Sequence, residues 1–190
     1  MKYHNITYPD MNNGDGLRVV LWLSGCSHHC KGCQNPQTWN PDSGIEFDSV
    51  AKEEIFEQLK NDYISGITFS GGDPLHENNI DEVLSLICGI RTTFPNKTIW
   101  LYTGYKIEEI GFCKAMCDYL KGDCDFQESL DNENKNLVRQ MIIAQCDVLV
   151  DGHYDDSKRN VNLPWVGSSN QRVILVNESI KKGEIVLWTN

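Results

Sequence analysis

The stretch that decides the fold covers residues 17–33, LRVVLWLSGCSHHCKGC. Residues 17–23 form a run of apolar and β-branched side chains of strand length, which predicts a strand buried on both faces. The turn-rich residues 24–44 follow, with three cysteines and two prolines, and we expect a loop there. A buried strand thus leads directly into a cysteine-bearing loop.

Short apolar segments alternate with segments of helical periodicity along the rest of the chain. The predicted strands cover residues 66–70, 98–103, 147–150, 172–176 and 185–188, and the predicted helices cover residues 50–63, 79–93, 107–120 and 137–145. Asp48 or Ser49 can cap the first of these helices. The alternation is typical of parallel βαβ units and predicts an α/β fold.

Unusual residues follow the predicted strands at their carboxyl ends. The cysteine loop follows the first strand, a Gly-Gly-Asp-Pro turn at residues 71–74 follows the second, Thr103 the third and Asp151 the fourth. Ligands of parallel barrels and open α/β sheets bind at the carboxyl ends of strands. We therefore expect these four segments to converge on one rim, with Thr103 and Asp151 placed there by position alone.

The composition excludes several classes of protein. The chain has 190 residues and a formal net charge of −10, which does not favour a basic nucleic-acid-binding surface. The longest apolar run, residues 19–23, is too short to cross a membrane, and the N-terminus has no signal-peptide pattern. We therefore expect a cytoplasmic, single-domain protein. Eight cysteines in such a chain indicate metal-binding or catalytic thiols rather than disulfides.

Cys26, Cys30 and Cys33 have the spacing C-x3-C-x2-C. Three thiolates this close can bind three irons of a [4Fe–4S] cluster and leave the fourth iron open to a small molecule, whereas electron-transfer clusters are closed by four cysteines. The alternative is a structural zinc site completed by His28, His29 or a distant cysteine. Zinc knuckles usually have a two-residue spacing in both halves, which is not the spacing found here.

The Gly71-Gly72-Asp73-Pro74 turn permits a close approach of the backbone to a ligand, because glycine has no β-carbon. In isolation the same four residues would be a simple tight turn. Their expected position beside the cysteine loop favours contact with a ligand.

The cysteine motif and this turn together resemble the radical S-adenosylmethionine (SAM) superfamily, and within it the glycyl-radical enzyme activases that serve anaerobic ribonucleoside-triphosphate reductases. The matching segments are residues 24–26 (SGC), 30–33 (CKGC), 35, 38–39, 70–75 (SGGDPL), 100–105 (WLYTGY), 147–152 (DVLVDG) and 167–172 (GSSNQR). The resemblance extends to about residue 176. The cysteine motif is shared by the whole superfamily, whereas the last two segments are specific to a much smaller group within it. It implies a compact, partial (open) parallel β/α barrel, with residues 1–190 as a single radical SAM domain.

The resemblance implies reductive cleavage of SAM at a [4Fe–4S] cluster, giving methionine and a 5′-deoxyadenosyl radical. That radical would take hydrogen from one glycine of the large subunit of the reductase. An electron donor such as flavodoxin would reduce the cluster. No catalytic side chain is implied, because the cofactor supplies the chemistry.

The resemblance assigns cluster binding to Cys26, Cys30 and Cys33. The residues assigned to SAM are Gly71, Gly72 and Asp73 at its methionyl end and Gly32, Cys33 and Gln34 along its adenine. Gln34 stands where the family commonly has an aromatic residue or histidine. Asn35 and Trp39 would brace the loop.

Residues 112–146 form a longer segment than the resemblance predicts, and we interpret it as an insertion. Its cysteines are Cys113, Cys117, Cys124 and Cys146. Their spacing matches no zinc or cluster pattern, so a second metal site and ordinary buried thiols both stay open. We expect Cys88 to be a core thiol.

Four alternative functions share parts of this pattern. A pyruvate formate-lyase activase or a deazaguanine synthase would share the cysteine loop but not the segment at residues 167–172. A zinc-binding adaptor would hold zinc without iron or sulfide. An iron–sulfur electron carrier would show no change of its cluster spectrum with SAM.

Overall fold

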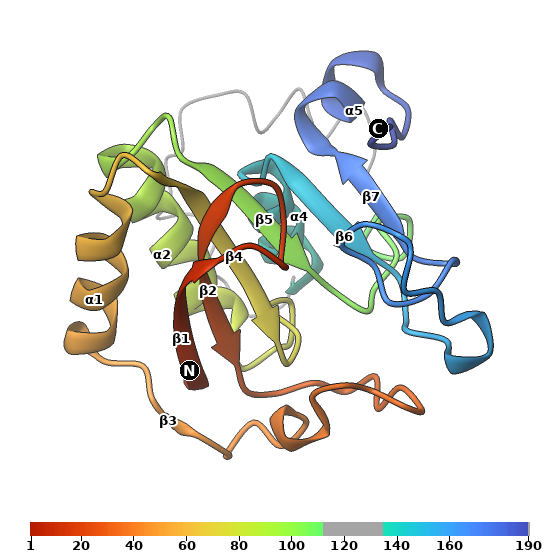
Figure 1. Cartoon of the computed structure of the whole chain (residues 1–190), viewed down its shortest axis with the longest axis horizontal. Coiled ribbons are helices and arrows are strands. Elements are labelled where there is room, and N and C mark those ends of the chain that lie inside the picture. The colour runs from red at the N-terminus through yellow and green to blue at the C-terminus, as the bar shows by residue number, and fades with distance from the viewer. Residues whose placement is uncertain (112–134, 190) are drawn as a thin grey trace.

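The computed structural model describes residues 1–111 and 135–189, which are built around one seven-stranded sheet with the strand order β3-β1-β2-β4-β5-β6-β7 (Figure 1). The strands are β1 Lys2–Asp10, β2 Leu17–Leu23, β3 Ile45–Glu46, β4 Ile64–Gly71, β5 Thr98–Tyr102, β6 Val148–Asp151 and β7 Arg172–Leu175. The described helices are α1 Ser49–Leu59, α2 Ile80–Thr93, α4 Lys135–Ala144 and α5 Val176–Lys182, with short 3-10 helices η1 Pro36–Thr38 and η2 Asp156–Lys158.

Four neighbouring strands, β2, β4, β5 and β6, pair in parallel, which confirms the predicted α/β fold. The outer strands β1, β3 and β7 pair antiparallel. The sequence pattern did not predict β1, because its two buried residues, Tyr3 and Ile6, are three positions apart rather than two. The strand predicted at residues 185–188 is reduced to an isolated bridge between Leu187 and Ile174, and α5 precedes it.

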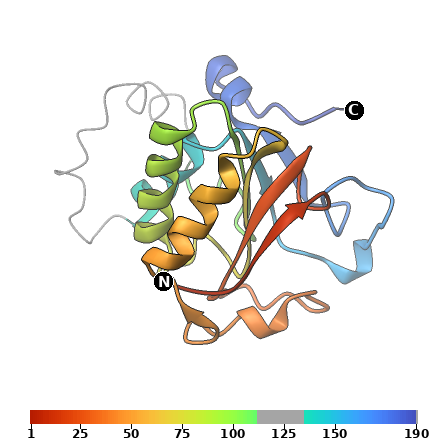
Figure 2. The same ribbon diagram turned by 60° about the vertical axis from the view of Figure 1, so that its left-hand side comes forward.

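The helices α1, α2 and α4 cover one face of the sheet (Figure 2). Alternate residues of the strands, among them Leu21, Phe69 and Leu101, point to these helices and form the main hydrophobic core. Asp48 caps α1, as predicted, because its side chain accepts hydrogen bonds from the backbone N–H groups of Val50 and Ala51. The longest described helix, α2, has 14 residues, and no described helix is long and apolar enough to span a membrane.

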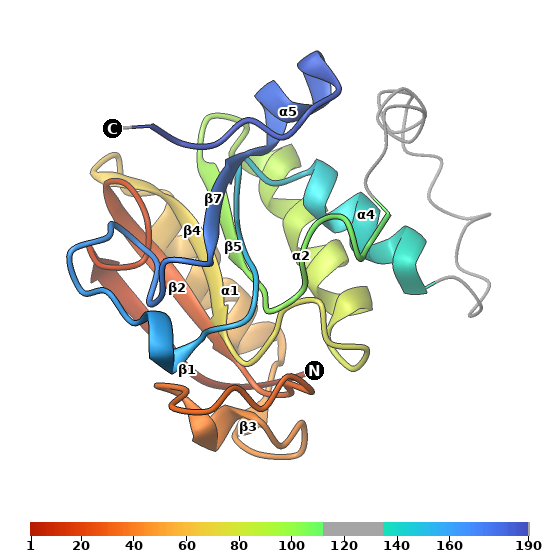
Figure 3. The same cartoon turned by 90° about the vertical axis from the view of Figure 1, so that its right-hand side faces the viewer.

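The opposite face, here called the inner face, is covered by chain segments without long helices, mainly residues 152–171 (Figure 3). Its row nearest the carboxyl ends of the parallel strands consists of Trp22, Ser70, Tyr102 and Val150. Below this row lies an aromatic cluster, in which the Trp100 ring is 4.9 Å from the Trp165 ring and 5.6 Å from the Trp188 ring. This cluster joins the sheet to residues 152–171 and to the C-terminal residues.

Arg18 is the one charged side chain of β2, and it is fully buried on the inner face. The sequence pattern indicated only an apolar strand there. The guanidinium donates hydrogen bonds to the hydroxyls of Thr68 (2.7 Å) and Thr98 (2.9 Å) and to the carbonyl oxygen of Ile67 (2.7 Å), and it lies over the Trp100 ring. Burial lowers the pKa of Arg18 to about 10, which still leaves it charged at neutral pH. The strand therefore carries a buried cation whose hydrogen bonds tie β2 to β4 and β5.

The proposed insertion at residues 112–146 is described only at its end. Cys113, Cys117 and Cys124 lie outside the described residues, as does most of the helix predicted at residues 107–120. Cys146 is fully buried in the main core, and burial raises the pKa of its thiol. Cys88 packs against the same core, as expected.

Candidate functional site

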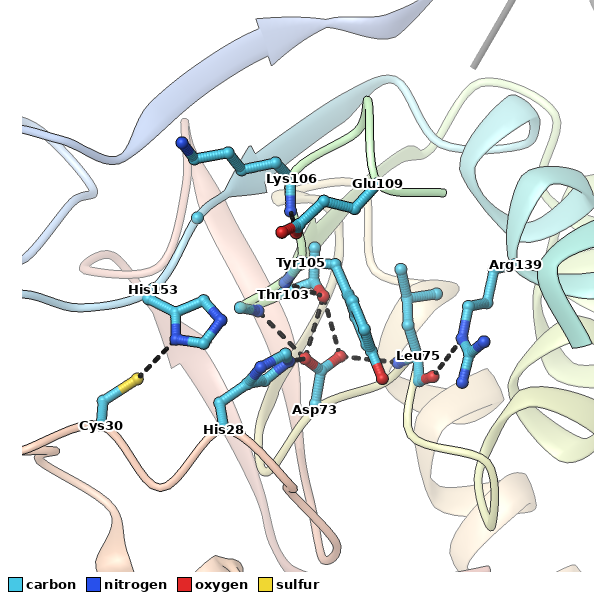
Figure 4. A network of polar contacts seen from close by, with 12 residues as sticks. His28, Cys30, Asp73, Leu75, Thr103, Tyr105, Lys106, Glu109, Arg139 and His153 are labelled. Atoms are coloured by element: carbon cyan, nitrogen blue, oxygen red, sulfur yellow. Dashed lines mark hydrogen bonds and ion pairs between the residues drawn. The ribbon is translucent and has the colours of Figure 1, made fainter. Parts of the chain in front are cut away.

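The carboxyl ends of the parallel strands bring the predicted segments together (Figure 4). The backbone N–H of Asp73 donates to the carbonyl oxygen of Gly25 at 2.7 Å, which joins the turn after β4 to the cysteine loop. The backbone N–H of Gly152 donates to the carbonyl oxygen of Tyr105 at 3.1 Å, which joins the segments after β6 and β5. The Asp73 carboxylate joins these two pairs because it accepts hydrogen bonds from the Thr103 hydroxyl and the Gly104 N–H, so the four segments form one continuous rim.

The three motif cysteines lie on the loop after β2, each partly exposed and with a free thiol. The loop is fixed by backbone hydrogen bonds, with Cys26 N–H donating to the Trp39 carbonyl (3.0 Å) and Cys33 N–H to the Cys30 carbonyl (3.1 Å). Burial raises the pKa of the Cys26 thiol to about 11 and also raises the pKa of Cys30. Because ligation requires thiolates, binding of iron would displace these protons.

The donor set of this loop fits an iron–sulfur cluster better than a single zinc ion. Thiolates are soft ligands that suit iron–sulfur clusters, and a cluster spreads its ligands over several ångströms. Within residues 1–111 and 135–189, no three His, Cys, Asp or Glu side chains gather around a point that could hold one metal ion. His28, one of the two histidines suggested as zinc ligands, instead contacts the Asp73 carboxylate.

Asp73 is the centre of the polar network at the rim (Figure 4). Its buried carboxylate accepts hydrogen bonds from the Thr103 hydroxyl (2.9 and 3.0 Å) and from the backbone N–H groups of Gly104 (3.0 Å) and Leu75 (2.8 Å). The Nε2 atom of His28 lies 2.7 Å from the same carboxylate. Asp73 therefore ties three of the rim segments together, while its predicted contact with SAM stays a prediction.

His28 anchors the cysteine loop from within, because its side chain is only 7% exposed and sits between two rings of the rim. Its imidazole contacts Tyr105 at 4.5 Å and His153 at 4.4 Å between ring centroids. The Nδ1 atom of His153 lies 3.9 Å from the Cys30 sulfur. Sequence reasoning missed the His28–Asp73 pair, since 45 residues separate the two and no motif joins them.

The glycines of the turn approach the protein's own backbone. A β-carbon at Gly72 would lie 2.6 Å from the carbonyl oxygen of Gly25, and one at Gly71, whose φ is +95°, would lie 2.8 Å from the Leu23 nitrogen. Both glycines are thus required by packing against the start of the cysteine loop. Packing is thus a second reason for these glycines beside the one given from the sequence, and their approach to SAM stays a prediction.

Asp151 has a structural role at the end of β6. Its buried carboxylate accepts a hydrogen bond from the Ile107 N–H at 2.9 Å and pairs with Arg172, whose Nε lies at 2.8 Å. Arg172 also pairs with Glu108, and this guanidinium lowers the pKa of Glu108 to about 2. Asp151 therefore joins three segments at the rim.

A cavity of about 460 Å³ lies against the inner face beside the cysteine loop. Its floor is Trp22, Ser70 and Tyr102, and one end is formed by Cys33, Gln34 and Asn35. The other side is lined by Leu163, Trp165, Val166, Gly167 and Gln171. None of the described residues that line it has a charged side chain, although the whole chain carries a net charge of −10. Of the residues assigned to SAM, Cys33 and Gln34 line this cavity, whereas Gly32, Gly71, Gly72 and Asp73 do not.

Comparison with known proteins gives consistent matches. A family model described as a 4Fe-4S single cluster domain matches residues 12–174. The anaerobic ribonucleoside-triphosphate reductase-activating protein of Escherichia coli strain K12 is 35% identical over 175 residues, covering 91% of this chain and 97% of the relative. Proteins of the same name from Enterobacteria phage T4 and Vibrio cholerae are each 36% identical over 173 residues, covering 91% and 90% of this chain and 93% and 96% of the relatives.

Proposed function

Since the chain belongs to the family of anaerobic ribonucleoside-triphosphate reductase-activating proteins, we propose that it activates such a reductase by generating a glycyl radical on its large subunit. In the reaction that we infer, one electron breaks a carbon–sulfur bond of SAM and yields methionine and a 5′-deoxyadenosyl radical. This radical takes a hydrogen atom from a glycine α-carbon, so that 5′-deoxyadenosine and the glycyl radical are the products. The chain would thus be a radical SAM oxidoreductase.

The cluster ligands in this proposal are Cys26, Cys30 and Cys33. A [4Fe–4S] cluster held by these three thiolates would supply the electron, and a set of three cysteines would leave one of its irons open to a small molecule. The observation that carries the proposal is the position of Cys33, which belongs to the cysteine loop and also lines the neutral cavity. A molecule in that cavity would therefore lie next to the cluster.

In this proposal the protein residues bind SAM, orient it relative to the cluster and shield the radical from solvent. Asp73 and His28 hold the cysteine loop against the turn after β4, which keeps the thiols in a fixed relation to the sheet. The cavity has the size of an ordinary small-molecule site, and Trp22, Tyr102, Tyr154 and Trp165 give it aromatic surface. We assign the adenine to the side formed by Gly32, Cys33 and Gln34, and the methionyl end to the side of Gly71, Gly72 and Asp73.

The fold also supports a proposal about the type of barrel. The parallel block from β2 to β6 and an inner face free of long helices are compatible with an open, partial β/α barrel of the radical SAM type. We propose that residues 1–190 form one such domain, with residues 112–146 as an insertion. We also propose cytoplasmic action and a flavodoxin-like electron donor, both on the resemblance to the family.

The test is anaerobic reconstitution with iron and sulfide, followed by SAM and reductant, with and without the reductase. We expect 5′-deoxyadenosine in all reduced samples and a glycyl radical signal only when the reductase is present. Cys26→Ala, Cys30→Ala and Cys33→Ala should each abolish both, whereas Cys88→Ala should retain both. Full activity of any one of the three motif variants would contradict the proposed ligand set.

A further inference from the structure

The chain segment after β6 lies against the cysteine loop at Cys30 (Figure 4). The Nδ1 atom of His153 is 3.9 Å from the Cys30 sulfur, although the two residues are 123 positions apart in the sequence. Burial raises the pKa of this thiol, and a hydrogen bond from the backbone N–H of Tyr154 opposes that rise. Two neighbouring residues of a distant segment therefore contact the same cysteine sulfur.

The other two motif cysteines are contacted from within their own loop. The backbone N–H of Asn35 donates to the Cys33 sulfur at 3.3 Å. The backbone N–H groups of His28 and His29 hydrogen-bond the Cys26 thiol. Within the described part of the chain, Cys30 is thus the motif cysteine whose sulfur has hydrogen-bonding contacts from outside the loop.

Residues 167–172, the GSSNQR segment that the sequence analysis singled out, hold the chain after β6 in place. The side-chain amide of Asn170 donates to the carbonyl oxygen of His153 at 2.7 Å. The side-chain amide of Gln171 donates to the carbonyl oxygen of Gly152 at 3.1 Å. Both bonds go to the backbone, so they fix the path of the chain at His153 and immediately before it.

A hydrogen bond to a cluster sulfur affects the electron affinity of the cluster, because such bonds are among the factors that set its reduction potential. A ligated thiolate has lost its proton and can only accept, so the Nδ1 atom of His153 would carry the hydrogen and donate. Reduction adds one electron, and the positive end of an N–H dipole stabilises the added negative charge. A donor at Cys30 therefore favours reduction.

We propose that His153 donates a hydrogen bond to the Cys30 thiolate of the bound cluster and raises its reduction potential, with Asn170 and Gln171 as positioning residues. This inference rests on the proposed cluster ligands and goes beyond them, because none of these three residues ligates iron. It also gives residues 167–172 a role, which is to place the chain after β6 against the cluster. The electron itself comes from the one-electron donor of the proposed reaction.

The test is His153→Phe, which keeps a ring beside His28 and removes the donor. His153 is exposed, so this variant should fold and load iron as the wild type does. In a redox titration of the cluster-loaded protein without SAM, at one pH, the ratio of reduced to oxidised cluster at a given potential should fall about two- to tenfold. A tenfold fall equals about 59 mV for a one-electron couple. His153→Asn, whose side-chain amide can donate from a similar position, should keep most of the wild-type potential.

Asn170→Leu tests the positioning role. It should lower the potential in the same direction as His153→Phe, and the double variant should fall by less than the sum, because both changes act on one hydrogen bond. Asn177→Leu is the matched control. Its side-chain amide also donates one hydrogen bond, to Asp147 at 3.1 Å, but at the opposite end of the sheet, so the potential should not change.

Three results would overturn the inference in distinguishable ways. An unchanged potential in His153→Phe would show that the imidazole does not donate to the cluster. An unchanged potential together with weaker SAM binding would assign the side chain to SAM. Loss of iron from His153→Phe would show that it only supports the loop. The proposed function fails separately, if the reconstituted wild type holds no [4Fe–4S] cluster or forms no 5′-deoxyadenosine from SAM and reductant.

Discussion

Replacing Asp73 by asparagine separates a structural role of this carboxylate from a role in binding SAM. The side chain is 2% exposed and accepts from the Leu75 N–H at one oxygen and from the Gly104 N–H at the other. An asparagine in either orientation turns its NH₂ group toward one of these backbone donors. When the NH₂ group takes the place of the oxygen next to His28, His28 loses its acceptor as well, whereas the Thr103 hydroxyl contacts both oxygens and keeps one in either orientation.

Leaving a buried donor unpaired costs about 1–3 kcal/mol, so the loss of one or two acceptors predicts a destabilisation of about 1–6 kcal/mol for Asp73→Asn. The cysteine loop should also load less iron, because its tie through His28 is weakened. Urea denaturation of the cluster-free protein measures the first effect, and iron per chain after anaerobic reconstitution measures the second. Asp62→Asn, at an exposed position, is the control and should match wild type in both.

The opposite pattern would refute this reasoning. If Asp73→Asn unfolds at the wild-type urea concentration and loads iron normally but does not bind SAM, the carboxylate acts on SAM rather than on the loops. In that case the network seen here would be rearranged when the cofactor binds.

Three further changes test other parts of the structure. Gly72→Ala places a β-carbon 2.6 Å from the Gly25 carbonyl oxygen, so it should cost about 1–3 kcal/mol of stability and reduce iron loading; normal loading would show that the turn can move freely. Arg18→Met leaves several buried acceptors unpaired and should destabilise by about 2–4 kcal/mol in urea; an unchanged midpoint would show that the buried cation is dispensable. The pKa of Glu108 is lowered to about 2 by Arg172, so its ion pair stabilises the protein above the ordinary pKa of about 4.5, and this contribution is lost as pH falls toward 2. Thermal midpoints of wild type and Glu108→Gln should therefore converge on acidification, and a constant difference down to pH 2 would contradict the assignment.

The sequence predicted those elements that can be recognised from a few consecutive residues. Leu17–Leu23 matches the predicted strand in both bounds, because a short apolar run needs no distant partner to be recognised. The rim was predicted by the rule that parallel strands present ligands at their carboxyl ends, and the contact of Asp73 with Gly25 follows that rule.

The features that escaped prediction depend on distant residues. Arg18 is buried because hydroxyls and carbonyls of β4 and β5 surround it, and its own strand gives no sign of them. A single charged residue in an otherwise apolar strand is the signal that could have indicated a buried polar network. The sequence similarly gives no sign that Tyr102 lines a cavity, because the other lining residues come from distant parts of the chain.

The central claim is hydrogen transfer from a reductase glycine to the adenosyl carbon of SAM, and isotope transfer tests it most directly. The reductase is prepared with glycine deuterated at the α-carbon and incubated anaerobically with the cluster-loaded protein, SAM and reductant. The account predicts one deuterium in the released 5′-deoxyadenosine and a glycyl radical signal that has lost its α-hydrogen coupling. Unlabelled 5′-deoxyadenosine together with an activated reductase would contradict it.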